Sequence, residues 1–135
     1  MTTLATVLST LQTAMAGLTG IKYAPDYPPE QASDFPFVVT YPDTYRGVVN
    51  TPQDFRMLYD IRVELHIARK DLYEDVRKLL DYPEIGANAL FDALITNSLA
   101  HEGIEGEFGA LNWGGVDTIG FVWTVKAVKV VTTIT

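Results

Sequence analysis

The stretch Phe55–Leu80, FRMLYDIRVELHIARKDLYEDVRKLL, changes its hydrophobic period part-way along. Up to Ile67, apolar and polar residues alternate, as they do in a strand with one covered face. From Asp71 onward, the apolar residues recur at helical spacing, so a short connection over residues 68–70 joins a strand to an amphipathic helix. The stretch therefore predicts a mixed α+β domain.

Towards the N-terminus, the sequence predicts a helix over Leu4–Ala16, where apolar residues recur every three or four positions. Thr2 or Thr3 is suited to cap its start, and Gly17 or Gly20 to end it. Its polar face is Ser, Thr and Gln with almost no charge, which suits either a weakly solvated surface or a packing surface for another subunit.

The segment Phe35–Tyr41 is typical of a short edge strand because Pro36 and Pro42 bound it. The sequence then predicts a long loop over residues 43–54 that links two strands of a hairpin. Long loops in small domains often have a function. This one contains residue types that suit a contact surface, namely Tyr45, Arg46, Val48 and Val49. An uninvolved hairpin tip is the alternative.

Beyond Leu80, we expect the helical pattern to break or kink at Pro83 and to resume until about Leu99. Two strands follow, Gly103–Trp113 and about Thr118–Thr132, separated by a glycine-rich turn. The last strand has apolar residues on both faces and must be covered on both. Its second face is expected to hold Val122, Val128 and Val130, covered either by a partner subunit or by the first helix.

Together these segments predict one domain over residues 1–135. We expect a mostly antiparallel sheet of about four strands, with helices packed on one face and the N-terminal helix first.

The composition excludes several classes of function. The chain contains no Cys, which excludes disulfides, thiolate nucleophiles and Cys-based zinc sites. Its net charge of −7 opposes tight binding to nucleic acid, which needs clustered Lys and Arg. No apolar run is long enough to span a bilayer, and the N-terminus lacks the features of a signal peptide. We therefore expect a soluble protein that is made in the cytoplasm.

No catalytic, cofactor-binding or metal-binding set is evident. His66 and His101 do not form a metal-binding pattern. His66 lies on the polar side of its strand, which favours solvated cross-strand pairing over catalysis. Glu105 and Glu107 would share a strand face, an arrangement that solvent-facing charge explains as well as glycoside chemistry does. The sequence also lacks a G-x-S-x-G motif and a phosphate-binding loop.

The element order and three segments resemble the tail terminator proteins of long-tailed bacteriophages. The segments are FPFVVTY at Phe35–Tyr41, MLYDIRVELHIAR at Met57–Arg69, and the helix opening DLYEDV at Asp71. The resemblance implies a small antiparallel sheet with helices on one face. It also implies a virion structural protein at the head-proximal end of the tail, assembled in the host cytoplasm.

The resemblance further implies a set of partners. Such proteins form a ring, usually a hexamer, that caps the tail tube, ends its polymerisation and provides a docking face for the head connector protein. Genomic DNA passes through the bore without sequence-specific binding, and no membrane is involved. On this basis we expect Tyr45–Gln53 to reach the tail tube protein or a neighbouring subunit, and the apolar C-terminal strand to lie at the subunit contact.

Other hypotheses remain open at this point. Other phage neck, head-completion or minor tail proteins share this element order. A non-catalytic, monomeric binding module and a small enzyme of unrecognised chemistry are the alternatives outside the virion.

Overall fold

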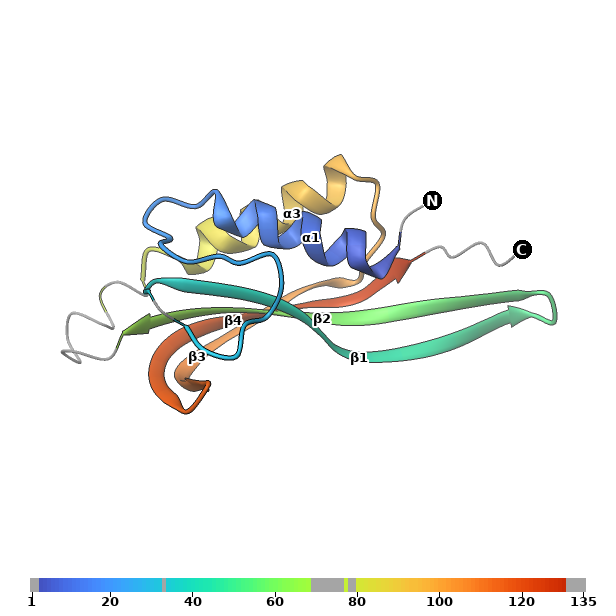
Figure 1. Cartoon of the computed structure of the whole chain (residues 1–135). Helices are drawn as coiled ribbons and strands as arrows, with labels where there is room; N and C mark the ends of the chain where they lie inside the picture. The colour runs from blue at the N-terminus through green and yellow to red at the C-terminus, as the bar shows by residue number, and fades with distance from the viewer. Residues whose placement is uncertain (1–2, 33, 69–76, 78–79, 131–135) are drawn as a thin grey trace.

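The described residues form one four-stranded antiparallel sheet with two helices on one of its faces (Figure 1). The computed structural model describes residues 3–32, 34–68, 77 and 80–130. In the sheet the strand order is β1-β2-β4-β3, so β1 and β3 form its edges. This arrangement confirms the predicted α+β class and the N-terminal helix. The elements are α1 (Leu4–Ala16), β1 (Phe37–Thr51), β2 (Asp54–Ala68), α3 (Pro83–Thr96), β3 (Gly103–Trp113) and β4 (Val116–Val130).

Helix α1 has the predicted bounds and caps. The Thr3 hydroxyl oxygen accepts a hydrogen bond from the backbone N–H of Thr6 at 3.2 Å, and Gly17 ends the helix. The face that α1 turns to the sheet is apolar and joins the main core. Its fully buried residues are Val7, Leu11 and Met15.

Helix α3 begins where the sequence predicts a break. Pro83 occupies the first turn, where its missing N–H would have no helical partner. Leu90 and Leu94 complete the core under this helix. Gly86 lets α3 approach the sheet closely, because a Cβ there would lie 2.3 Å from the Trp123 ring. The helix predicted to open at Asp71 falls almost entirely outside the described residues.

The predicted loop over residues 43–54 is wrong. β1 continues to Thr51 and β2 begins at Asp54, with a two-residue turn between them. Pro42 does not end β1, because an edge strand can accommodate a residue without an N–H and the register shifts immediately after it. The edge position expected for this strand is confirmed.

The predicted assignment of side chains to the two faces of the last strand is also wrong beyond Val125. A β-bulge places Ala127 at a φ of 52° opposite Asp60, whose Oδ1 accepts the Ala127 N–H at 2.9 Å. This hydrogen bond is the main reason why the pKa of Asp60 lies below its ordinary value. The extra residue turns Val128 and Val130 into the helix-covered core.

The opposite side of the sheet, here called the reverse face, is covered in part by the tip of the β3–β4 hairpin. Figure 1 shows this hairpin curling away from the helices. Trp113 at its tip lies against the rings of Phe37, Tyr41 and His66. The Trp113 indole N–H donates to the carbonyl of Pro29 at 2.9 Å. This bond holds the proline-rich loop between α1 and β1, which contains Pro25, Pro28 and Pro29, against the same region.

Candidate assembly surfaces

The most prominent surface feature is a β-hairpin arm, here defined as residues 44–56 of β1 and β2. The last described pair between β2 and β4 is Met57 with Val130, so the outer part of the arm, residues 48–56, extends past the described three-stranded part of the sheet. Figure 1 shows it projecting beyond both helices. A two-stranded hairpin alone is marginally stable in water. The arm is therefore a segment that gains from being covered by a partner.

One side of the arm carries an apolar strip, here defined as Tyr45, Val49 and Phe55. These side chains are 72%, 66% and 62% exposed. The strip continues the helix-covered face of the sheet, because Tyr45 and Tyr59 line a shallow hollow together with Leu4 at the start of α1. Exposed apolar groups that gather in this way mark interaction surfaces more often than single exposed residues do.

Gly47 allows the aromatic part of this strip to lie flat. A Cβ on Gly47 would stand 2.5 Å from the Phe55 ring, so the ring occupies the space above the glycine. The glycine and Phe55 therefore act together to shape the surface. The sequence signal for this feature is the spacing of Tyr45, Gly47 and Val49 at every second position, which is typical of a strand.

The reverse side of the arm is polar. Arg46 lies there, and its Nη2 atom is 3.6 Å from the Glu102 carboxylate at the start of β3. Both side chains are largely exposed, so this ion pair contributes little to stability. Val48 is half-buried on the same side as Arg46.

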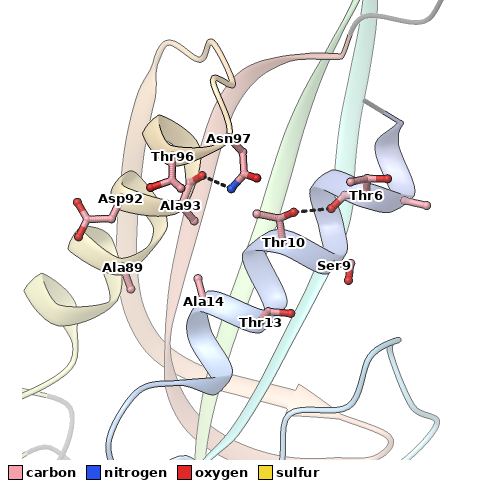
Figure 2. Close-up of a pocket in the computed structure, with 11 residues that line it drawn as sticks. Thr6, Ser9, Thr10, Thr13, Ala14, Ala89, Asp92, Ala93, Thr96 and Asn97 are labelled. Atoms are coloured by element: carbon pink, nitrogen blue, oxygen red, sulfur yellow. Dashed lines mark hydrogen bonds between the residues drawn. The ribbon is translucent and has the colours of Figure 1, made fainter. Parts of the chain in front are cut away.

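A groove of about 810 Å³ separates α1 and α3 on the outer surface of the helices (Figure 2). Small side chains line the groove, and two of its polar side chains bond to the backbone of their own helices. Thr10 donates to the carbonyl of Thr6 at 2.8 Å, and Asn97 donates to the carbonyl of Ala93 at 2.7 Å. Among the described residues that line it, Asp92 is the only ionisable one, so these residues offer a packing surface without an acid–base pair.

A network of ionisable side chains lies on the reverse face beneath Trp113. One Glu64 carboxylate oxygen accepts hydrogen bonds from the Tyr41 hydroxyl and from Arg62 Nε at 2.9 Å. The other accepts from His66 Nε2 at 2.8 Å. His66 Nδ1 lies 2.6 Å from the Thr118 hydroxyl. In the described part of the chain, every buried side-chain N or O atom has a hydrogen-bond partner.

The electrostatics of the network follow from burial and these donors. Burial alone raises the pKa of Glu64, but the hydrogen bonds from His66, Tyr41 and Arg62 outweigh it and lower the pKa to about 2. Burial, followed by the hydrogen bond to Glu64, raises the pKa of Tyr41. Glu64 is thus held as a buried anion with three donors.

The predicted solvated pairing of His66 is wrong, because its side chain is completely buried. Trp113 and Phe37 cover it, and the sequence gives no direct signal for that long-range contact. A buried histidine with both nitrogens bonded has no path to a substrate, so we assign the network a structural role. His101 is half-buried, and its Nδ1 accepts the N–H of Gly103 at 3.1 Å.

Glu105 and Glu107 are exposed on the reverse side of β3, where they border a small hollow with Val122 and Thr124.

Among the residues with described positions, no group of three or more His, Cys, Asp or Glu side chains could hold a metal ion. The helices described here are all too short or too polar to cross a membrane.

The structure separates the residues expected at an interface into two groups. Tyr45, Arg46, Val48 and Val49 all lie on the arm, close together and at least partly exposed. Val122, Val128 and Val130 are buried within the chain and offer no surface to a partner. This burial corrects the expectation that they lie at a subunit contact. The alternative, that another part of the same chain covers the strand, holds for Val128 and Val130, because the helices cover them.

Phe55 is the surface residue that sequence reasoning missed. It belongs to the strip but lies at the start of the predicted strand, and only the pairing of Val49 with Phe55 places it beside the others. Comparison with known proteins gives no further identification, because no family model and no curated protein matches this chain.

Proposed function

We propose that this chain is a virion structural protein of a long-tailed phage, which forms a ring on the tail tube. The ring ends tube polymerisation and offers a docking face to the head connector protein. The observation that supports the proposal best is an open sheet whose arm projects from one side of the fold. A closed ring needs two different surfaces on each subunit. The arm, which includes the β1 edge, and the opposite edge at β3 are such a pair.

The surface chemistry supports assembly over catalysis. Asp92 is the single ionisable residue among those described along the α1–α3 groove, and His66 is buried inside the fold. The net charge of −7 also suits a bore through which DNA must pass without being held. The identification of the tail as the site of assembly comes from the sequence resemblance alone.

The first test is the solution mass across a concentration series, measured by light scattering. A hexamer has about six times the 14.9 kDa mass of one chain. We expect a ring-sized species in the wild type and its loss in a variant with Tyr45→Ser and Phe55→Ser. Tyr27→Ser is the matched control, because Tyr27 is 73% exposed but lies outside the arm.

The second test adds the protein to polymerising tail tube protein and measures tube lengths by electron microscopy. A terminator shortens the tubes and appears as a cap at one end. A ring that binds the tube without limiting its length would favour another neck or tail-completion protein. A chain that stays monomeric with and without the tube protein would overturn the proposal in favour of a binding module.

A further inference from the structure

We infer, given the proposed assembly into a ring, that the arm of one copy lies along the β3 edge of the next copy. The sheet would then continue from chain to chain. β1 and β3 are the two edges of the sheet, and edge strands present backbone N–H and C=O groups that can pair with another strand. Charge and apolar surface select which edges meet.

The charge of the chain is unevenly distributed. Between Asp81 and Val125 there are seven carboxylates and no Lys or Arg, and acids and bases balance in the rest of the sequence. The whole net charge of −7 therefore lies on residues 81–125, which contain α3, β3 and the first part of β4. The β3 edge is the acidic edge of the sheet.

This acidity disfavours pairing between two β3 strands. An antiparallel pair centred on Gly106 would place Glu105 of one chain next to Glu107 of the other, and like charges that face each other across strands are destabilising. A two-fold contact through β3 is thus unfavourable. The edge instead suits a strand with basic side chains on the same face.

The arm is such a strand. Residues 44–56 have a net charge of +1, with Arg46 on β1 and Arg56 on β2. Arg46 lies on the reverse face, as Glu105 and Glu107 do. Within the chain, Arg46 already lies near a carboxylate of the acidic region, Glu102. Exchanging this exposed pair for a similar one between copies costs little.

The other face of the same strands matches as well. Phe108 is 69% exposed on the helix-covered side of β3, where its ring stacks on Phe121 with centroids 6.3 Å apart. The apolar strip of the arm lies on the corresponding side. An aromatic side chain buries roughly 150–250 Å². Pairing the arm with β3 therefore joins apolar surface on one face and opposite charges on the other.

The contact uses different surfaces on the two copies, so it is head-to-tail and propagates around a ring. It predicts a specific pattern of chemical cross-links. The natural chain has no Cys, so single engineered thiols report one position each. We would introduce Val48→Cys on the arm and Glu107→Cys on β3, separately and together, and add a short bis-maleimide at high protein concentration.

The expected result is a ladder of dimers and higher species from the double variant. A mixture of the two single variants should give dimers and nothing larger. Each single variant alone should stay monomeric. Dimers from the Val48→Cys chain alone, dimers from the Glu107→Cys chain alone, or no cross-link in the mixture would overturn the inference.

Charge reversal tests the selectivity of the contact in the same assay. Because position 107 carries the engineered Cys, the edge charge is reversed at Glu105 alone. Arg46→Glu should reduce cross-linking about tenfold, and so should Glu105→Lys. Combining the two changes should restore it to within about twofold of the starting yield. Glu84→Lys on α3 is the matched control, because it makes the same charge change away from the edge. No recovery in the combined variant would refute the pairing of these charges.

The two proposals can fail separately. A ring-sized mass without cross-links between arm and edge would leave the ring standing and remove this contact. A ladder from the double variant, with no effect on tube length, would leave the contact standing and remove the tail terminator function.

Discussion

Replacing Glu64 with Gln is expected to remove a pH-dependent part of the stability. The carboxylate is buried, and Tyr41, Arg62 and His66 all donate to it. Its pKa is lowered from an ordinary value of 4.5 to about 2. A difference of this size corresponds to roughly 3 kcal/mol of stability when the carboxylate is ionised in both the folded and the unfolded chain. Gln keeps the size of the side chain and loses the charge.

The sign follows from the direction of the shift. Because the folded pKa is depressed, the stabilisation is fully present above pH 4.5 and is lost as the pH falls towards 2. The wild type should therefore lose its advantage over the Glu64→Gln variant across that window. At pH 2 about half of the Glu64 side chains remain ionised in the folded protein, so most of the difference in stability between the two proteins should be gone there, and the rest should vanish at lower pH.

The assay is urea unfolding of both proteins at several pH values between 7 and 2, followed by circular dichroism. Glu107→Gln is the control, because this carboxylate is exposed on the same face and its removal should change stability by less than about 0.5 kcal/mol. A constant difference between wild type and the Glu64→Gln variant from pH 7 to pH 2 would refute the reasoning.

Three further substitutions test the packing and the bulge. Gly86→Ala gains about 1 kcal/mol of helix propensity but places a Cβ 2.3 Å from Trp123, so overpacking of about 1–3 kcal/mol should prevail and lower the Tm. In a Trp123→Leu background, which is itself less stable, Gly86→Ala should lower the Tm much less. Asp60→Ala leaves the Ala127 N–H without its acceptor. The free energy of unfolding, measured in urea, should therefore fall by about 1–3 kcal/mol. An unchanged value would mean that the bulge does not need the carboxylate. Gly114→Ala should lower the Tm for two reasons. The residue has a φ of 59°, and a Cβ there would lie 2.3 Å from a backbone carbonyl oxygen of the proline-rich loop. A rise in Tm would contradict this turn geometry.

Local sequence patterns predicted the helices and strands well. Helix α1 has an N-cap threonine, a terminal glycine and an apolar stripe within one short segment, and each of these signals acts locally. The alternation of β2 is equally local, and it gives the correct strand and the correct buried side, including Ile61, Val63 and Leu65. Pro83 marked the true start of α3 for the same reason.

The candidate surfaces were predicted only in part. The residue types at 45–49 indicate a contact surface, but Pro42 predicts the end of a strand where β1 in fact continues. Whether a proline ends a strand depends on whether its position needs a hydrogen-bond donor, and that depends on the strand being at the edge of the sheet. The order of the strands, a tertiary property, therefore decided that the supposed loop is a paired β-hairpin arm.

By itself, the sequence determined the α+β class, the order of the elements and the acidic balance, since these follow from local spacing and composition. Only the tertiary structure decided the facing of Val128, the burial of His66 and the position of Phe55 beside Val49. Each of these depends on a partner distant along the chain, such as Asp60 at the bulge of Ala127 or Trp113 over His66. A hydrophobic pattern records whether a residue prefers to be covered, whereas the folded chain determines which residue covers it.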